Sequence, residues 1–144
     1  MIAYFDSSSI VKWFFDEPSM DLARGIKERA EIAFTSLIAF PEVMSAINRA
    51  YRSGRCSSSD MKLIKEEFSR IWLDFQRIGV NDGLIQHAGS LIFNYGLRAV
   101  DAVHLASALL LRQESEGIEF FFSCFDNTLN SAALKEGFKT HQLA

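Results

Sequence analysis

Four acidic residues stand at positions from which their carboxylates could share a metal ion. Asp6 and Asp126 each follow an apolar run, and two more acids, Glu42 and Asp101, lie near the starts of expected helices. Clustered carboxylates raise one another's pKa unless a cation lies among them, and oxygen-only ligands favour Mg²⁺ or Mn²⁺. Each acid alone has an ordinary interpretation as a helix cap or surface charge. Together they predict a metal site of the kind that hydrolyses phosphate esters.

The elements that must position these acids alternate between strands and helices. Apolar runs and helical periodicity predict, in order, a strand, two helices and a strand at residues 2–5, 8–15, 20–30 and 31–35. Ser36 is expected to cap a helix that runs through Arg52 to a stop at Gly54. Pro41 would lie in the first turn of that helix or mark a kink.

The second half of the chain continues this alternation. Residues 57–60 are expected to cap a helix whose apolar residues recur from Met61 to Phe75, until Gly79. Further helices, a strand, a helix and a short terminal run are predicted at about 82–95, 99–113, 118–125, 128–136 and 138–142. The pattern predicts a three-layer α/β/α domain with a central, mostly parallel sheet of four to five strands. Because ligands bind beyond the carboxyl ends of such strands, Asp6 and Asp126 should share a crevice if their strands are neighbours.

Composition sets the remaining bounds. A chain of 144 residues, 49% of them hydrophobic, is expected to form one domain over 1–144 with a substantial core. Its two cysteines, without a Cys/His cluster, indicate a reducing compartment. No signal-peptide pattern and no run of roughly 18 apolar residues is present, so we expect a cytoplasmic protein that does not span a membrane. With a net charge of −3, binding of nucleic acid would need a local basic patch.

Four stretches of the sequence resemble, in the right order, the motif regions of one enzyme family. They are DSSSIVKWFFDEPS, FPEVMSAINRA, LRAVDAVHLASAL and FFSCFDNTLNSAALKEGF. Together they resemble PIN-domain ribonucleases, specifically the toxins of VapBC type, and DAVHLASAL and DSSSIVK are the most specific parts. The resemblance implies a PIN-like fold and metal-assisted hydrolysis of RNA phosphodiester bonds, in tRNA or another structured RNA. It also implies a homodimer and a cognate antitoxin whose tail lies across the acidic crevice.

The same resemblance assigns roles to individual residues. It implies that Asp6, Glu42, Asp101 and Asp126 form the catalytic site and hold one or two Mg²⁺ or Mn²⁺ ions. Ser8, two residues after the first acid, would support the site through its hydroxyl group.

Cys124 departs from the family's pattern, which usually has Thr or Ser two residues before the last acid. A thiol is a poorer hydrogen-bonding group, so the support around Asp126 is expected to be weaker. Ser123 would compensate only if the strand is locally irregular.

Substrate could be bound by basic residues near the acids. Ser45, Arg49 and Arg52 follow Glu42 at three- and four-residue steps and form one stripe of the helix. This stripe could be a phosphate track, and a solvated helix face is the equal alternative. Lys12 falls within the first motif and could face substrate, although a surface lysine is the simpler interpretation.

Two further features have a structural and a functional interpretation. His104 follows Asp101 by three residues and could contact metal or act as a general acid, but its apolar neighbours favour a hydrogen-bonded, partly buried histidine. The aromatic residues 13–15 cannot all face inward on a helix, so at least one should be exposed or cover a subunit contact.

Other protein classes fit less well. A haloacid-dehalogenase-type phosphatase needs a second Asp two residues after the first, where this chain has Ser8. A receiver-like phospho-acceptor needs an adjacent acidic pair after the first strand, and that pair is missing. A catalytically silent PIN-like module that binds RNA or protein stays open, although it would predict a gap among the four acids.

Overall fold

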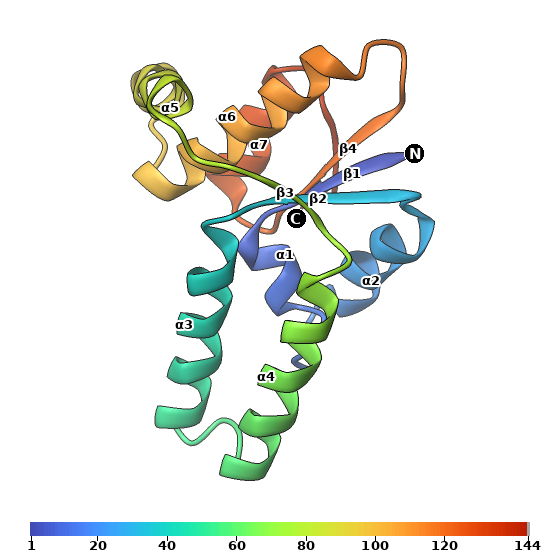
Figure 1. Cartoon of the computed structure of the whole chain (residues 1–144), viewed down its shortest axis with the longest axis vertical. Helices are drawn as coiled ribbons and strands as arrows, with labels where there is room; N and C mark the ends of the chain where they lie inside the picture. The colour runs from blue at the N-terminus through green and yellow to red at the C-terminus, as the bar shows by residue number, and fades with distance from the viewer. Residues whose placement is uncertain (144) are drawn as a thin grey trace.

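The computed structural model describes residues 1–143, and a five-stranded parallel sheet lies at its centre. Figure 1 shows this sheet between two groups of helices. The strands are β1 (Ile2–Phe5), β2 (Ile32–Ser36), β3 (Gln76–Ile78), β4 (Phe120–Ser123) and β5 (Lys139–Thr140). Their order across the sheet is β3-β2-β1-β4-β5, and every neighbouring pair is parallel. Strands β1 and β4 are therefore direct neighbours, as the convergence of Asp6 and Asp126 requires.

Helices cover both faces of the sheet (Figure 1). One layer contains α1 (Ser7–Val11), α2 (Met20–Arg29), α3 (Ala39–Arg52) and α4 (Ser58–Trp72). The other contains α5 (Asp82–Tyr95), α6 (Ala99–Glu114) and α7 (Asn127–Lys135). The predicted α/β/α fold with a parallel sheet is confirmed. None of the helices in residues 1–143 combines the length and the apolar character that crossing a membrane requires.

The pleat of β1 divides its side chains between two cores. Ile2 and Tyr4 pack among residues of α5, α6 and α7, whereas Ala3 and Phe5 pack among residues of α1 to α4. All four side chains are buried. A strand covered on both faces needs apolar residues at every position, which explains why the sequence shows continuous apolar runs instead of alternation.

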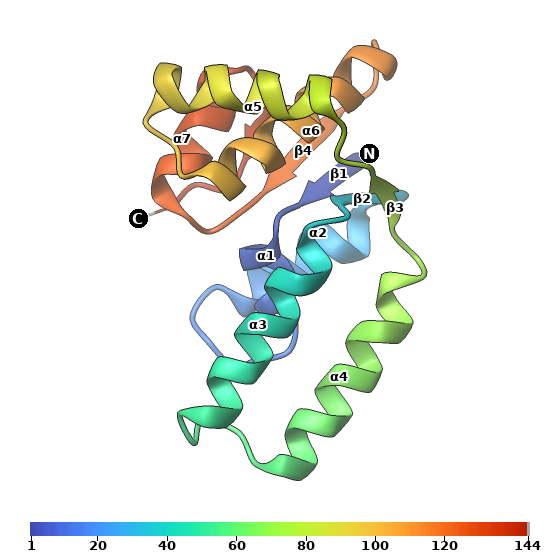
Figure 2. The same ribbon diagram turned by 60° about the vertical axis from the view of Figure 1, so that its left-hand side comes forward.

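Helices α3 and α4 form a hairpin that extends away from the sheet (Figure 2). Phe68 of α4 is fully buried, with ring-centroid distances of 5.3 Å to Phe40 and 5.9 Å to Trp72. These rings lie where the hairpin meets the sheet. Their packing holds the first turn of α3, which carries Glu42, against the apolar core on this face of the sheet.

Two expected boundaries of this hairpin are wrong. Ser36 does not cap α3, which begins at Ala39; Pro41 is the third residue of the helix and so lies in its first turn. Helix α4 ends at Trp72 and does not continue to Gly79, because residues 76–78 pair with β2 as strand β3. Phe75 fits the apolar spacing of the helix, but it packs beside Phe5 at the entry to the strand.

The prediction of a helix over residues 8–15 is also too long. Helix α1 ends at Val11, and residues 12–14 form a turn. Trp13 and Phe15 are buried, and Phe14 is partly buried against Phe68. None of the three is exposed, because a turn can direct adjacent side chains inward where one helix face cannot; the alternative that the partly buried Phe14 covers a subunit contact stays a prediction.

Candidate active site at the carboxyl edge of the sheet

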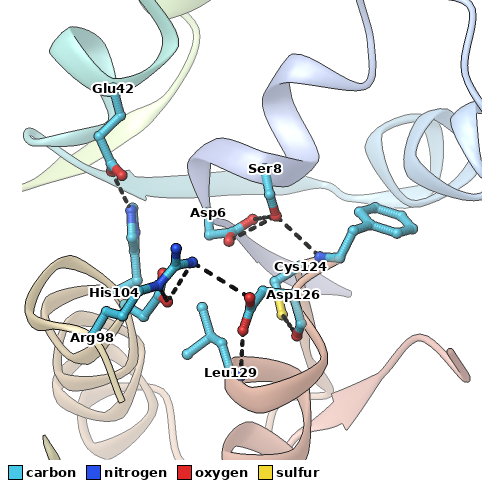
Figure 3. Close-up of polar contacts among 10 residues, drawn as sticks. Asp6, Ser8, Glu42, Arg98, His104, Cys124, Asp126 and Leu129 are labelled. Atoms are coloured by element: carbon cyan, nitrogen blue, oxygen red, sulfur yellow. Dashed lines mark hydrogen bonds and ion pairs between the residues drawn. The ribbon is translucent and has the colours of Figure 1, made fainter. Parts of the chain in front are cut away.

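The four predicted acids line one cleft of about 1010 Å³. They come from four separate places in the chain: the end of β1, the first turn of α3, the first turn of α6 and the residue before α7. Figure 3 shows how Asp6, Glu42 and Asp126 lie around this space. The structure therefore brings all four acids together, although they are separated by up to 120 positions in the sequence.

Asp6 is held in place by the residues that follow it. It is the N-cap of α1, and its Oδ1 accepts a hydrogen bond of 2.9 Å from the backbone N–H of Ser9. The hydroxyl of Ser8 donates to both carboxylate oxygens, at 2.7 and 2.9 Å, and accepts from the backbone N–H of Phe125 at 3.0 Å. Ser8 thus links the acid at the end of β1 to the segment after β4 (Figure 3).

Burial perturbs the acid–base chemistry of Asp6. Its side chain is only 2% exposed. Loss of hydration raises the pKa of Asp6 to about 6, against opposing effects of His104 and of the hydrogen bonds from Ser8 and Ser9. The negative charge of Asp101 acts in the same direction as burial and is a smaller cause of this shift. A carboxylate that is buried among other acids is a group to which a cation would bind favourably.

Glu42 is oriented by a buried histidine. The Nε2 atom of His104 lies 2.7 Å from Oε1 of Glu42, and Nδ1 lies 2.7 Å from the hydroxyl oxygen of Tyr4. A carboxylate only accepts hydrogen bonds, so Nε2 carries the proton, and the Tyr4 hydroxyl donates to Nδ1 when the ring is neutral. His104 is hydrogen-bonded, as expected, but it is fully buried instead of partly buried.

Arg98 joins the other two acids. Its guanidinium lies 3.1 Å from Oδ2 of Asp101 and 3.4 Å from Oδ2 of Asp126 (Figure 3). The second oxygen of Asp126, Oδ1, accepts a 2.9 Å bond from the backbone N–H of Leu129 and so caps α7. One arginine therefore spans the start of α6 and the start of α7.

Asp101 shows the effect of this arrangement on charge. Burial raises the pKa of Asp101, and the neighbouring Asp126 raises it further, whereas the guanidinium of Arg98 lowers it. The pKa of Arg98 is raised in turn, chiefly by Asp101 and then by Asp126. These mutual effects show that the acids are close enough to repel one another.

The support around Asp126 does not come from a neighbouring hydroxyl on β4. The thiol of Cys124 is fully buried and makes only long contacts, 3.7 Å to the carbonyl oxygen of Asp126 and 3.9 Å to Oδ1 of Asn130. Ser123 does not compensate, because its hydroxyl lies 2.6 Å from Ser9 Oγ and 2.8 Å from His141 Nε2. Burial also raises the pKa of Cys124, so the group stays a thiol.

The predicted substrate-binding residues differ in their surroundings. Lys12 and Arg49 line the cleft, whereas Arg52 is not among its lining residues and donates to Asn48 instead. Lys12 donates to Glu17 Oε2 at 2.9 Å, and Arg49 donates to Ser45 Oγ at 3.0 Å. The stripe on α3 therefore leads out of the cleft after Arg49.

The donor set of the cleft fits a divalent ion on chemical grounds. In residues 1–143, no group of three Asp, Glu, His or Cys side chains is arranged to hold one ion as the side chains now lie. Their oxygens are occupied by Arg98, which Asp101 and Asp126 share, and by His104, which contacts Glu42. The acids are thus already paired with a positive charge, that of the Arg98 guanidinium. Carboxylate oxygens are also the ligands that Mg²⁺ and Mn²⁺ prefer.

Some residues of the site were missed by sequence reasoning. Arg98 directly precedes α6 and carries a signal that could have been read, since a cation three residues before Asp101 can pair with it on a helix. Tyr4 and His141 carry no such signal. Their roles depend on which strands are neighbours, because Tyr4 meets His104 across 100 residues and His141 reaches Ser123 from beside β5.

Sequence comparison identifies a known family along most of the chain. The family described as "PIN domain" matches residues 3–133. Ribonuclease VapC45 of Mycobacterium tuberculosis (strain CDC 1551 / Oshkosh) is 33% identical over 108 residues, which cover 75% of this chain and 75% of that protein.

Solved structures agree with this family at the level of the fold. M. tuberculosis VapC20, a sarcin-ricin loop cleaving toxin, matches with a TM-score of 0.67 and 18% identity, over 94% of this chain and 95% of its own. A toxin-antitoxin complex from Klebsiella pneumoniae contains a chain that matches with a TM-score of 0.60 and 21% identity, over 86% of both chains. Since the family match covers most of the sequence and the fold agrees with it, this chain belongs to the PIN-domain family.

Proposed function

We propose that this chain is the ribonuclease toxin of a toxin–antitoxin pair. It acts as a Mg²⁺- or Mn²⁺-dependent endoribonuclease that hydrolyses phosphodiester bonds of tRNA or another structured RNA, in the cytoplasm. Residues 1–144 act as one PIN-like domain. The observation that carries the proposal is the convergence of four acids from distant parts of the chain in one cleft.

We assign different roles to the four acids. Asp6, Glu42 and Asp101 are the proposed direct ligands of the metal, and Asp126 binds a second ion or orients water. A divalent ion bound there would lower the pKa of a bound water and offset charge on the leaving oxygen. Ser8 fixes the carboxylate of Asp6, and His104 fixes that of Glu42.

RNA would reach the acids along the cleft. Arg49 and Lys12 offer cationic groups on the walls that carry Glu42 and Asp6, respectively, so each could contact a phosphate. Because Lys12 is also paired with Glu17, we expect Arg49 to contribute more. The contribution of these residues should weaken with rising salt.

The proposed partners follow the relatives. VapC45 is a ribonuclease, and the structure from K. pneumoniae is a toxin-antitoxin complex. We propose that a cognate antitoxin likewise restrains this chain by covering the acidic cleft, and that the chain forms a homodimer.

The test is cleavage of total tRNA and of short single-stranded RNAs by the purified protein with Mg²⁺, Mn²⁺ or EDTA. Asp6→Asn and Asp101→Asn should each abolish metal-dependent cleavage, with a loss of about 10³-fold or more, because each removes a charge on which the metal depends. Circular dichroism should show an intact fold. Full activity in a folded Asp6→Asn protein would contradict the proposal.

A second candidate function is a catalytically silent PIN-like module that binds RNA or protein. The pairing of the acids with Arg98 and His104 favours it, because these contacts keep the carboxylates occupied without a metal. Such a module should show no effect of Mn²⁺ on melting temperature, whereas the nuclease should be stabilised as Mn²⁺ binds its folded state.

A further inference from the structure

We infer that the guanidinium of Arg98, a cation supplied by the chain itself, competes with the divalent ion for the carboxylates of Asp101 and Asp126. This inference rests on the metal site of the proposed function and adds to it a residue that sets how tightly the metal binds. Arg98 belongs to neither the acids nor the predicted phosphate track, yet its guanidinium contacts two of the four acids.

The competition follows from which oxygens Arg98 contacts. On Asp126, Oδ1 accepts the hydrogen bond from the backbone N–H of Leu129, and Oδ2 is the oxygen that Arg98 contacts. Arg98 lies 3.4 Å from this Oδ2 and 3.1 Å from Oδ2 of Asp101. An ion bound between these two oxygens would lie against the guanidinium, and two like charges at that distance repel.

The contacts of Arg98 are suited to exchange. Its side chain is 78% exposed, and the backbone of Arg98 precedes α6 without a side-chain capping bond that would fix it. Exposed ion pairs are weak, and the guanidinium can regain hydration when it leaves. By contrast, Asp101 is only 14% exposed on its side chain, so the acid remains when the arginine moves.

The arginine also has a purpose while no metal is bound. Its guanidinium contacts both Asp101 and Asp126 and so offsets the repulsion between two carboxylates that come from the starts of different helices. It therefore keeps the two carboxylates close together, ready for an ion. The expected consequence is a site that is held together without metal and fills only when the metal concentration exceeds what displacement of Arg98 requires.

Arg49 provides the matched control. It lines the same cleft, and Arg49→Gln makes the same change of charge, but its guanidinium donates to the hydroxyl of Ser45 instead of a carboxylate. If the loss of any positive charge from the cleft lining were enough, Mn²⁺ binding would tighten in both variants. Competition for the acids would affect only Arg98→Gln.

The experiment measures Mn²⁺ binding by the full chain, without RNA, from the electron paramagnetic resonance signal of free Mn²⁺. Arg98→Gln should tighten the Kd by about 3- to 10-fold, and Arg49→Gln should change it less than about 2-fold. Arg98→Lys keeps the positive charge but lacks the planar guanidinium that contacts both carboxylates, so it should give an intermediate Kd. It replaces Arg98→Gln as the test variant if the Gln variant folds poorly. Asp101→Asn should weaken binding in every background.

The outcomes separate this inference from the proposed function. If Mn²⁺ binds and Asp101→Asn abolishes binding, but Arg98→Gln behaves like Arg49→Gln or binds more weakly, the competition is overturned and the metal site stands. If neither the unaltered chain nor Arg98→Gln binds Mn²⁺, both the competition and the proposed metal site are overturned. Tighter binding in Arg98→Gln alone supports the inference.

Discussion

The ends of β1 and β4 carry two polar regions that differ in kind. On the cleft side, four acids meet the guanidinium of Arg98 and the imidazole of His104. On the buried side, which we call the rear network, neutral groups meet: Ser9, Ser123, His141 and Asn130. Adjacent residues belong to different regions: Ser8 contacts Asp6 in the cleft, and Ser9 contacts Ser123 in the rear network. The same strand ends thus build a region of exchangeable contacts in front of a region of fixed ones.

The difference lies in what each group could bind instead. In the rear network Ser9 and Ser123 are fully buried and His141 is 6% exposed, so a broken hydrogen bond there would leave a polar atom without a partner. No such unpartnered atom occurs among buried side chains of residues 1–143. In the cleft, the guanidinium of Arg98 is exposed, so water can replace its contacts with the acids. We infer that the rear network holds the strand ends still while the cleft changes partners.

His104 tests this division because it belongs to both regions: it is buried, yet it contacts Glu42 in the cleft. His104→Phe keeps a ring of similar size but removes the donor to Glu42. If Glu42 binds metal as proposed, we expect RNA cleavage to fall about 10- to 100-fold, the usual cost of losing a residue that orients a metal ligand. Initial rates at saturating Mn²⁺ measure the effect.

Two further variants separate orientation from packing. His104→Gln can place an amide N–H near the position of Nε2 and should recover much of the rate. Tyr4→Phe removes the hydrogen bond on the far side of the imidazole and should cost less than about 3-fold. Equal rates for His104→Phe and the unaltered chain would show that the orientation of Glu42 does not matter.

His141 tests the rear network. Its Nε2 lies 2.8 Å from Ser123 Oγ, and its ring stacks on Phe125 at a centroid distance of 4.6 Å. His141→Leu should lower the free energy of unfolding by about 1–3 kcal/mol, because Ser123 loses a buried partner. Urea unfolding at pH 7.5 measures this loss. Cleavage should change less than about 3-fold, and a larger drop with normal stability would mean that the rear network takes part in the chemistry.

The pH dependence of stability should have opposite signs in the two regions. Burial, and to a smaller extent Arg29, lowers the pKa of His141 from 6.5 to about 4. Between these values the unfolded chain binds the extra proton, so the contribution of His141 is complete above pH 6.5 and lost as the pH falls towards 4. Burial raises the pKa of Asp6 from 3.8 to about 6, so its folded state binds the extra proton and stability is lost as the pH rises through 6.

These two slopes can be isolated by subtraction. Unfolding free energies of the metal-free protein between pH 4 and 7 should rise less steeply with pH in His141→Leu, and more steeply in Asp6→Asn, than in the unaltered chain. The His141 effect should amount to at most about 3 kcal/mol across the window. Parallel curves for all three proteins would refute the assignment of a buried neutral imidazole and a buried acid.

The residues of the cleft could be predicted from the sequence better than those of the rear network. Acids that follow apolar runs or begin helices are visible locally, and parallel strands bring their ends to one edge, so the grouping of Asp6 and Asp126 could be predicted. Strand β3 could not, because Phe75 extends the helical spacing of α4 while its side chain belongs to the core of the sheet. His141 could not either, since its partner Ser123 is reached only after β4 and β5 have paired.

Cys124 should give the smallest effect, although the resemblance to PIN-domain ribonucleases led us to expect weaker support of Asp126 there. It lies between the two regions, fully buried, with contacts of 3.7 and 3.9 Å that are too long to hold Asp126 firmly. Cys124→Ser should therefore change stability by no more than about 1 kcal/mol and cleavage by less than about 3-fold. The carboxylate of Asp126 is held by Leu129 and Arg98, which the substitution leaves in place. Arg98→Gln is measured in parallel for comparison. A gain in cleavage of 10-fold or more in Cys124→Ser would show instead that the buried thiol weakens the support of Asp126 and that the two regions are not independent.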